Sequence, residues 1–195
     1  MKILKAKIND AEAISQIHRK MISGGFLSGL GGKFLLKLYE KIIRSDNNFC
    51  FIVKDNKEMV AFACATKNTK ALYRDFLKSN FFLAIMITIK KIFSLSSLKK
   101  ILDHLIYNSK KIGLPEAELL SIAVINKHKR KKLGTKLCKK INEEFLNFGI
   151  REYIIITASD NFESNSFFKN VGYKKIKNIR IHKDRKSSIY SIKMK

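Results

Sequence analysis

The sequence predicts one α/β (α+β) domain. Three observations support this class. Apolar residues switch repeatedly between strand-like alternation and helical spacing along the chain. Two pairs of strand-like runs are separated by short polar turns, as in antiparallel hairpins. The chain has 195 residues, 46% of them hydrophobic, which is enough for one core rather than two. No linker or internal repeat divides the chain, so we expect residues 1–195 to form one domain.

The N-terminal part is expected to contain a strand, two helices and a hairpin. Residues 2–8 alternate loosely in hydrophobicity, and Asn9 lies where a helix would begin. A glycine-rich joint separates this helix from a second one over residues 33–44. Two β-rich runs, 48–54 and 59–66, flank a polar turn and predict adjacent antiparallel strands.

Residues 70–112 predict two amphipathic helices, over about 73–93 and 98–109. The apolar run 81–89 is about half the length needed to cross a bilayer. It is followed directly by two lysines. We therefore expect a buried or interfacial helix face here rather than a membrane span.

The C-terminal part begins with a strand at 118–124, a basic turn, and a helix with apolar residues at four-residue steps. A buried strand is expected at 153–157 and a short helix at 163–170. Residues 174–181 and 188–194 then predict a closing hairpin.

The charge of the chain is strongly positive, with 40 Lys and Arg against 16 Asp and Glu and a formal net charge of +24. Such an excess favours anionic partners: nucleic acid, a membrane surface, a phosphorylated substrate or the phosphates of a cofactor. A compositional bias toward Lys, Ile and Asn explains the charge equally well.

Three cysteines, Cys50, Cys64 and Cys138, are an odd number without CxxC spacing. We expect neither a disulfide framework nor a zinc site, and therefore a reducing compartment. Residues 1–7 contain charges and no apolar run like that of a signal peptide. These features favour a cytoplasmic protein that holds no metal.

A basic turn before the helix near Gly134 is the candidate anion site. Free backbone N–H groups and the positive end of a helix dipole bind phosphate, and five of the six residues 127–132 are Lys or Arg, His128 being the exception. The alternative is a solvated basic loop. The candidate phosphate contacts are Lys129, Arg130, Lys131, Lys132, Leu133, Gly134 and Thr135.

The same region resembles the acyl-CoA-binding motif of the GNAT N-acetyltransferase family. The motif follows a strand like Ile122-Ala123-Val124 and places a basic residue where Lys129 stands and a Gly or Ala where Gly134 stands. Lys132 occupies the place of the motif's first glycine. It offers a backbone N–H but not the conformational range of glycine.

Residues 161–173 resemble a second GNAT stretch. Asn161, Phe167, Gly172 and Tyr173 agree with it, and Ser164 replaces an alanine. The two motifs stand in the family's order and separation. The resemblance implies a mixed, mostly antiparallel central sheet of about seven strands flanked by helices, with a helical insertion between strands 3 and 4.

The resemblance also implies an N-acetyltransferase that moves the acetyl group of acetyl-CoA to a primary amine of a small molecule, such as a nucleotide-linked amino sugar, or of a peptide. The backbone of Ile122, Ala123 and Val124 would pair with the pantetheine arm, and one N–H would polarise the thioester carbonyl. Asn161, Ser164 and Phe168 would contact the cofactor.

Phe168 stands where many family members have a tyrosine that protonates the departing thiolate. A phenyl ring has no proton to give. The thiolate therefore leaves unprotonated, or Tyr173, Ser164 or a water serves as the donor.

The attacking amine must lose a proton, so a base or water relay is needed. The resemblance points to Glu118, which strand alternation would place on the same face as Ile122 and Val124. Burial there would raise a carboxyl pKa, which suits a base. Glu118 as a plain strand residue paired with a lysine is the alternative. Glu116 is a further candidate, as is His18 on the first helix, which otherwise reads as a half-buried structural histidine.

The rival function is a non-catalytic CoA- or nucleic-acid-binding protein on a GNAT fold. The phenylalanine at 168 supports it, whereas the lack of aromatic residues interleaved with the basic ones argues against nucleic acid. Residues 70–112 are expected to cover the acceptor side of the cleft or to form a homodimer contact rather than to support the core. A membrane surface is a third option for their apolar face.

Overall fold

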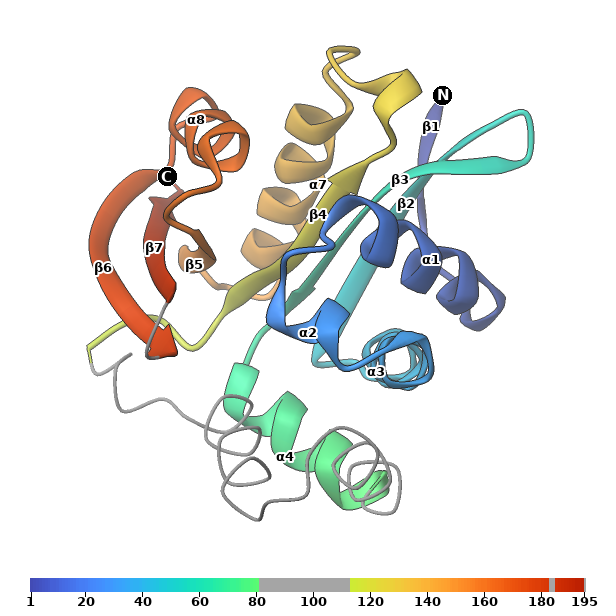
Figure 1. The fold of residues 1–195 in the computed structure, drawn as a ribbon, viewed down its shortest axis with the longest axis horizontal. Coiled ribbons are helices and arrows are strands. Elements are labelled where there is room, and N and C mark those ends of the chain that lie inside the picture. Colours follow the sequence, from blue (N-terminus) through green and yellow to red (C-terminus); the bar gives the residue numbers. More distant parts are fainter. Residues whose placement is uncertain (81–112, 183–184, 195) are drawn as a thin grey trace.

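The computed structural model describes residues 1–80, 113–182 and 185–194, and its centre is one seven-stranded sheet (Figure 1). The strand order is β1-β2-β3-β4-β5-β7-β6, and every neighbouring pair is antiparallel except β4 and β5. The predicted mixed, mostly antiparallel sheet is thus confirmed. The strands are β1 (Lys2–Lys5), β2 (Asn48–Asp55), β3 (Glu58–Thr66), β4 (Glu118–Val124), β5 (Glu152–Ala158), β6 (Lys174–His182) and β7 (Arg185–Lys193).

The described helices follow the apolar periodicity closely. Two short 3-10 turns accompany them, η1 (Ile8–Asp10) and η3 (Asn126–His128). The first strand ends at Lys5 rather than at the expected residue 8, where η1 begins. The helices are α1 (Ala11–Met21), α2 (Phe26–Gly29), α3 (Gly32–Arg44), α4 (Thr69–Ser79), α7 (Leu133–Asn147) and α8 (Phe162–Asn170). None of those in the described ranges is long and apolar enough to span a membrane.

Two apolar clusters fill the two faces of the sheet. One cluster packs α1, α3 and α4 against one face, with Leu35, Phe62 and Phe76 among its fully buried members. The other packs α7 and α8 against the opposite face, with Leu137 and Phe145 at its centre. Strands β2 and β3 are buried on both faces, which explains their nearly continuous apolar sequences.

The order of the last two strands was not predicted. β7 lies between β5 and β6, pairing with β5 along seven positions from Glu152 opposite Lys193 to Ala158 opposite Ser187. β6 therefore forms the edge of the sheet. Lysines along β6, which include Lys174 and Lys175, hinder pairing of this edge with another chain.

The expectation that residues 70–112 do not support the core is wrong for the described part of that range. Helix α4 buries Leu72, Phe76 and Leu77 in the cluster around α1 and α3. The Phe76 ring packs edge-on against Phe34, with 5.0 Å between centroids. Residues 81–112, which carry the rest of the predicted helix pair and its suggested acceptor-side or dimer contact, lie outside the described residues.

The expectation of no disulfide is also wrong. Cys50 on β2 lies opposite Cys64 on β3, and the structure joins the two as a disulfide, whereas Cys138 is free and buried. The 14-residue separation gave no spacing signal, because the pairing depends on the register of the hairpin. The cysteines consequently no longer argue for a reducing compartment.

Candidate active site

The candidate site lies between the strands β4 and β5 (Figure 1), which are parallel and pair at a single position, Glu118 opposite Ile154. Beyond that pair, a cleft of about 910 Å³ opens between residues 120–124 of β4 and residues 155–157 of β5. Because strands that diverge leave backbone N–H and C=O groups without ladder partners, β4 presents such groups to a ligand.

A bulge in β4 sets which side chains face which helix layer. Cys64 pairs with Ser121 and the next residue of β3, Ala65, pairs with Leu119, so Leu120 is an extra residue in the ladder. Ser121 and Ala123 consequently face the α1 and α3 layer, while Ile122 packs with the α7 layer. Alternation had wrongly placed Glu118 on the face of Ile122, because it took no account of the bulge.

The basic turn lies at one end of the cleft, where α7 begins. Arg130 and Lys132 both adopt left-handed backbone conformations, with φ of 62° and 57°. Lys132 therefore adopts a left-handed conformation for which glycine is usual, although it is the residue that replaces the motif's first glycine. Helix geometry leaves the amides of the first turn of α7 without intrahelical acceptors, so they are available to an anion.

Gly134 allows α7 and α8 to approach closely beside the cleft. A Cβ atom at this position would lie 3.0 Å from Cζ of Phe167 on α8, so the Phe167 ring would have to shift by a few tenths of an ångström to admit a larger residue. The glycine thus serves helix packing at a point that also lines the cleft.

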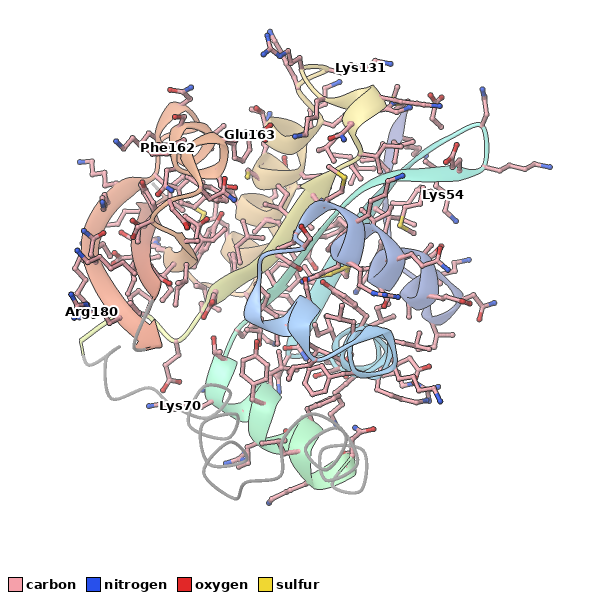
Figure 2. All side chains as sticks on the ribbon, viewed as in Figure 1. Lys54, Lys70, Lys131, Phe162, Glu163 and Arg180 are labelled. Atoms are coloured by element: carbon pink, nitrogen blue, oxygen red, sulfur yellow. A yellow bond between two sulfur atoms is a disulfide. The ribbon has the colours of Figure 1, made fainter. Side chains whose placement is uncertain are left out.

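An ion pair joins the two walls of the cleft. Nζ of Lys129 lies 2.8 Å from Oε1 and 2.9 Å from Oε2 of Glu163, in the first turn of α8. Both residues line the cleft, whereas Lys131 lies at the outer end of the basic turn and does not (Figure 2). Positive charge and helix dipole thus meet at one place, and Glu163 holds one of the lysines there.

The α8 wall contains the other predicted cofactor contacts. Asn161 caps α8, its Oδ1 accepting the N–H of Ser164 at 3.0 Å, and both residues line the cleft. Phe168 also lines it, with its ring packed against Phe167 and Tyr173. Asn161 thus both caps α8 and lines the cleft.

Tyr173 is ill-suited to protonate a thiolate. Its hydroxyl is bonded to that of Tyr153 and contacts Cys138, and it does not line the cleft. Burial, followed by the neighbouring Cys138 and Tyr153, raises the pKa of Tyr173 far above the usual range for tyrosine.

Neither predicted carboxylate lines the cleft. Glu118 is 8% exposed, and its Oε2 accepts a hydrogen bond of 3.0 Å from Oγ1 of Thr69 on α4. Glu116 accepts from the side chain of Asn68 and lies 3.5 Å from Nζ of Lys70. The start of β4 is therefore tied to α4 by both residues.

His18 is buried rather than half-buried, and it too lies outside the lining of the cleft. Its Nδ1 is 2.5 Å from the hydroxyl of Tyr39, which in turn lies 3.0 Å from Oγ of Ser121. Burial lowers the pKa of His18 to about 4, so the ring is neutral at neutral pH.

Sequence reasoning missed Tyr39 and Ser121. Tyr39 lies on the apolar face of α3, where an aromatic residue is expected to be part of the hydrophobic core. The one available signal was the hydroxyl of Ser121, which lies between the apolar residues Leu120 and Ile122.

In the described part of the chain, no group of three or more His, Cys, Asp or Glu is placed to hold a metal ion.

The comparisons with known proteins agree with this geometry. No curated protein matches the chain. Among solved structures, the ribosomal-protein-S18-alanine N-acetyltransferase of Escherichia coli is 15% identical, with a TM-score of 0.61 over 99% of this chain and 93% of that one. The PaiA N-acetyltransferase of Thermoplasma acidophilum, solved with coenzyme A, is 14% identical, with a TM-score of 0.61 over 98% of each chain.

A putative streptothricin acetyltransferase of Bacillus anthracis, solved with acetyl coenzyme A, is 12% identical with a TM-score of 0.53, over 80% of this chain and 68% of that one. At these identities the likeness shows the fold alone. The family model "Acetyltransferase (GNAT) family" matches residues 25–173, which include β4, the basic turn, α7, β5 and α8. The chain therefore belongs to the GNAT acetyltransferase family and is an acyltransferase.

Proposed function

We propose that the protein transfers the acetyl group of acetyl-CoA to a primary amine, with the cofactor bound in the cleft between β4 and β5. The observation that carries this proposal is the meeting of two ligand-binding features in one cleft. Residues 120–124 offer backbone groups released by strand divergence, and the basic turn offers the N-terminus of α7. An extended amide arm ending in a pyrophosphate matches both.

The cofactor contacts follow from this placement. The amides of Leu133, Gly134 and Thr135 would bind the pyrophosphate, with charge from Lys129, Arg130 and Lys132. The backbone of residues 122–124 would pair with the pantetheine amides, and one of its N–H groups would polarise the thioester carbonyl. Lys131 would add only long-range charge, because it lies outside the lining.

The acceptor would enter from the α1 side. Met21 and Ile22, at the end of α1, line the cleft opposite the β5 and α8 wall, and Ser121 faces the same layer. A small molecule, such as an amino sugar, or a peptide N-terminus supplies the amine; one structural neighbour is named as a ribosomal-protein-S18-alanine N-acetyltransferase. Acetyl-CoA is an intracellular cosubstrate, which supports a cytoplasmic location.

The test is calorimetric titration with acetyl-CoA, followed by release of the CoA thiol in the presence of amine probes. The probes are a peptide with a free N-terminus, an amino sugar and a diamine. We expect micromolar binding and turnover of at least one probe. Lys129→Ala should weaken binding, whereas Lys37→Ala, which breaks a Lys–Glu pair of the same 2.8 Å length on α3, should not.

Two other outcomes are informative. Binding without turnover of any amine would favour the non-catalytic CoA-binding protein, for which the phenyl ring of Phe168 in place of a proton donor is the supporting observation. Lack of acetyl-CoA binding would contradict the proposed function altogether.

A further inference from the structure

A chain of three polar side chains runs from the cleft into the core beneath α1 and α3. The Ser121 hydroxyl lies 3.0 Å from that of Tyr39, and the Tyr39 hydroxyl lies 2.5 Å from Nδ1 of His18. The three residues come from β4, α3 and α1, up to 103 positions apart, and are 5%, 2% and 2% exposed. Since buried polar groups are costly unless they are bonded, this arrangement constrains all three elements.

The surroundings of this chain are almost entirely apolar. The His18 ring stacks on Phe62 of β3 at 6.4 Å between centroids, and the Tyr39 ring meets the same phenyl ring edge-on at 5.6 Å. Among the described residues, Tyr73 of α4 and Glu118 of β4 are titratable neighbours, since burial and then the charges of Glu118 and Tyr39 raise the pKa of Tyr73. Ser121, Tyr39 and His18 are at most 5% exposed and only Ser121 lines the cleft, so within the described part of the chain the cleft is their route to bulk water.

Ser121 is the end of the chain that reaches the cleft. It lines the cleft together with Ala123, and the β4 bulge turns its side chain toward the layer from which Met21 and Ile22 also line the cleft. The acceptor amine is proposed to enter there. Ser121 is consequently the polar side chain of β4 nearest to where amine and thioester would meet.

The direction of the hydrogen bonds follows from acidity. A phenol is a far stronger acid than a neutral imidazole, so the Tyr39 hydroxyl donates to Nδ1 of His18, and the ring carries its hydrogen on Nε2. Tyr39 then accepts a hydrogen bond from Ser121, so Oγ of Ser121 can only accept a hydrogen bond from a ligand in the cleft. An N–H group of an amine can donate that bond.

We propose that Ser121, Tyr39 and His18 form the route by which the attacking amine loses its proton. This inference rests on the proposed acetyltransferase function. The amine nitrogen bonds to the thioester carbon and passes a proton to Oγ of Ser121. Ser121 passes its hydrogen to Tyr39, and Tyr39 passes its own to Nδ1 of His18, which becomes an imidazolium.

The same route returns the proton. When the C–S bond breaks, the electron pair stays on sulfur as the CoA thiolate. The imidazolium lies in an apolar site that disfavours charge, so it readily gives the proton back through Tyr39 and Ser121 to the thiolate. The products are the acetylated amine and the CoA thiol, and His18 is neutral again. The route thus supplies the acid that Phe168 cannot.

His18 acts through this relay although it does not line the cleft. Glu118 also lies outside the lining, and its carboxylate accepts from Thr69 on the side of α4. The described contacts thus connect His18 with a cleft-lining hydroxyl, and Glu118 with a helix.

The experiment compares Tyr39→Phe and Ser121→Ala with the wild type, using whichever amine probe the wild type turns over. Each variant removes a link of the chain with little change in shape. We expect kcat to fall about a hundredfold, the usual contribution of general acid–base catalysis, while KM and Kd for acetyl-CoA stay unchanged. Ser121→Thr, which keeps a hydroxyl, should restore most of the rate.

Matched controls separate catalysis from stability. Tyr190→Phe and Ser188→Ala remove the hydroxyl groups of two other buried residues, which are bonded to Asn165 and Asn178. Both controls should retain wild-type kcat. Wild-type kcat in Tyr39→Phe or Ser121→Ala, or a hundredfold loss confined to Glu118→Gln, would overturn the relay while leaving the acetyltransferase function intact.

A measurement without an acceptor covers the case in which a variant fails to fold. Nitrogen-15 NMR of the wild-type protein saturated with CoA should show His18 as the Nε2–H tautomer, with Nδ1 accepting a hydrogen bond. Observing the Nδ1–H tautomer would reverse the direction of the chain and overturn the proposal. If the wild type turned over no amine at all, the proposed function would fail instead.

Discussion

Lowering the pH from about 7 to about 5 should destabilise the protein through His18. The side chain is 2% exposed, and burial lowers its pKa from 6.5 to about 4. The unfolded chain therefore binds a proton in this pH window while the folded one does not. The contribution of His18 to stability is fully present above about pH 6.5 and is lost as the pH falls toward 4.

The size of the effect follows from the two pKa values. With a pKa of 6.5 unfolded and about 4 folded, protonation of the unfolded chain lowers the free energy of unfolding by roughly 2 kcal/mol at about pH 5 and very little at about pH 7. Tyr39 on α3 and Phe62 on β3 contact the ring, and neither carries charge near neutral pH.

Urea unfolding at the two pH values, for the wild type and His18→Gln, measures this effect. The variant has no titrating ring, so it should lose about 2 kcal/mol less than the wild type between the two pH values. Groups such as Asp10 are common to both proteins and cancel in the difference. Equal losses in the two proteins would refute the argument that a buried, neutral His18 carries the pH dependence.

Three further predictions concern the cleft and the core. Gly134→Pro should abolish micromolar acetyl-CoA binding in calorimetry, because it removes an N–H at the start of α7; retained binding in a folded variant would place the phosphate site elsewhere. Glu163→Gln should tighten acetyl-CoA binding about threefold at low salt, because it frees Lys129 from an exposed ion pair that is worth less than about 1 kcal/mol. The control Glu40→Gln, which breaks the Lys37–Glu40 pair, should leave the affinity unchanged. Phe76→Ala should lower the free energy of unfolding by about 3 to 5 kcal/mol in chemical denaturation, since α4 belongs to the core; a loss under about 1 kcal/mol would show that it does not.

The segment from β4 to α8 could be predicted from sequence because its signals are local. The apolar run of β4, the basic turn and the four-residue steps of α7 each lie within a short window. The structure has β4 at the expected residues 118–124 and begins α7 at Leu133, next to the expected Gly134. Helix α8, which lies within the second motif, agrees within one residue with the expected helix 163–170 for the same reason. Local periodicity is enough where one element buries one face.

Features that depend on distant pairings could not be predicted. The position of β7 between β5 and β6, and the pairing of Cys50 with Cys64, both depend on sheet register. The extra residue Leu120 in β4 reversed the expected direction of Glu118, since one inserted residue changes the face of every side chain beyond it.

The bonds of His18 were out of reach for the same reason. Its partner Tyr39 lies 21 positions away on another helix, and Ser121 lies 82 positions beyond Tyr39. In sequence, His18 was one of four histidines without ligand spacing. Only the packing of α1 and α3 on β4 shows that it is connected to the cleft.

The most direct test of the acetyltransferase assignment is a crystal structure of the protein with acetyl-CoA. We predict electron density in the cleft between β4 and β5, with the pyrophosphate on the amides of residues 133–135 and the thioester beside residues 122–124. The carbonyl carbon should lie within reach of an amine that is hydrogen-bonded to Ser121. Acetyl-CoA bound outside this cleft, or none bound at millimolar concentration, would contradict the central claim.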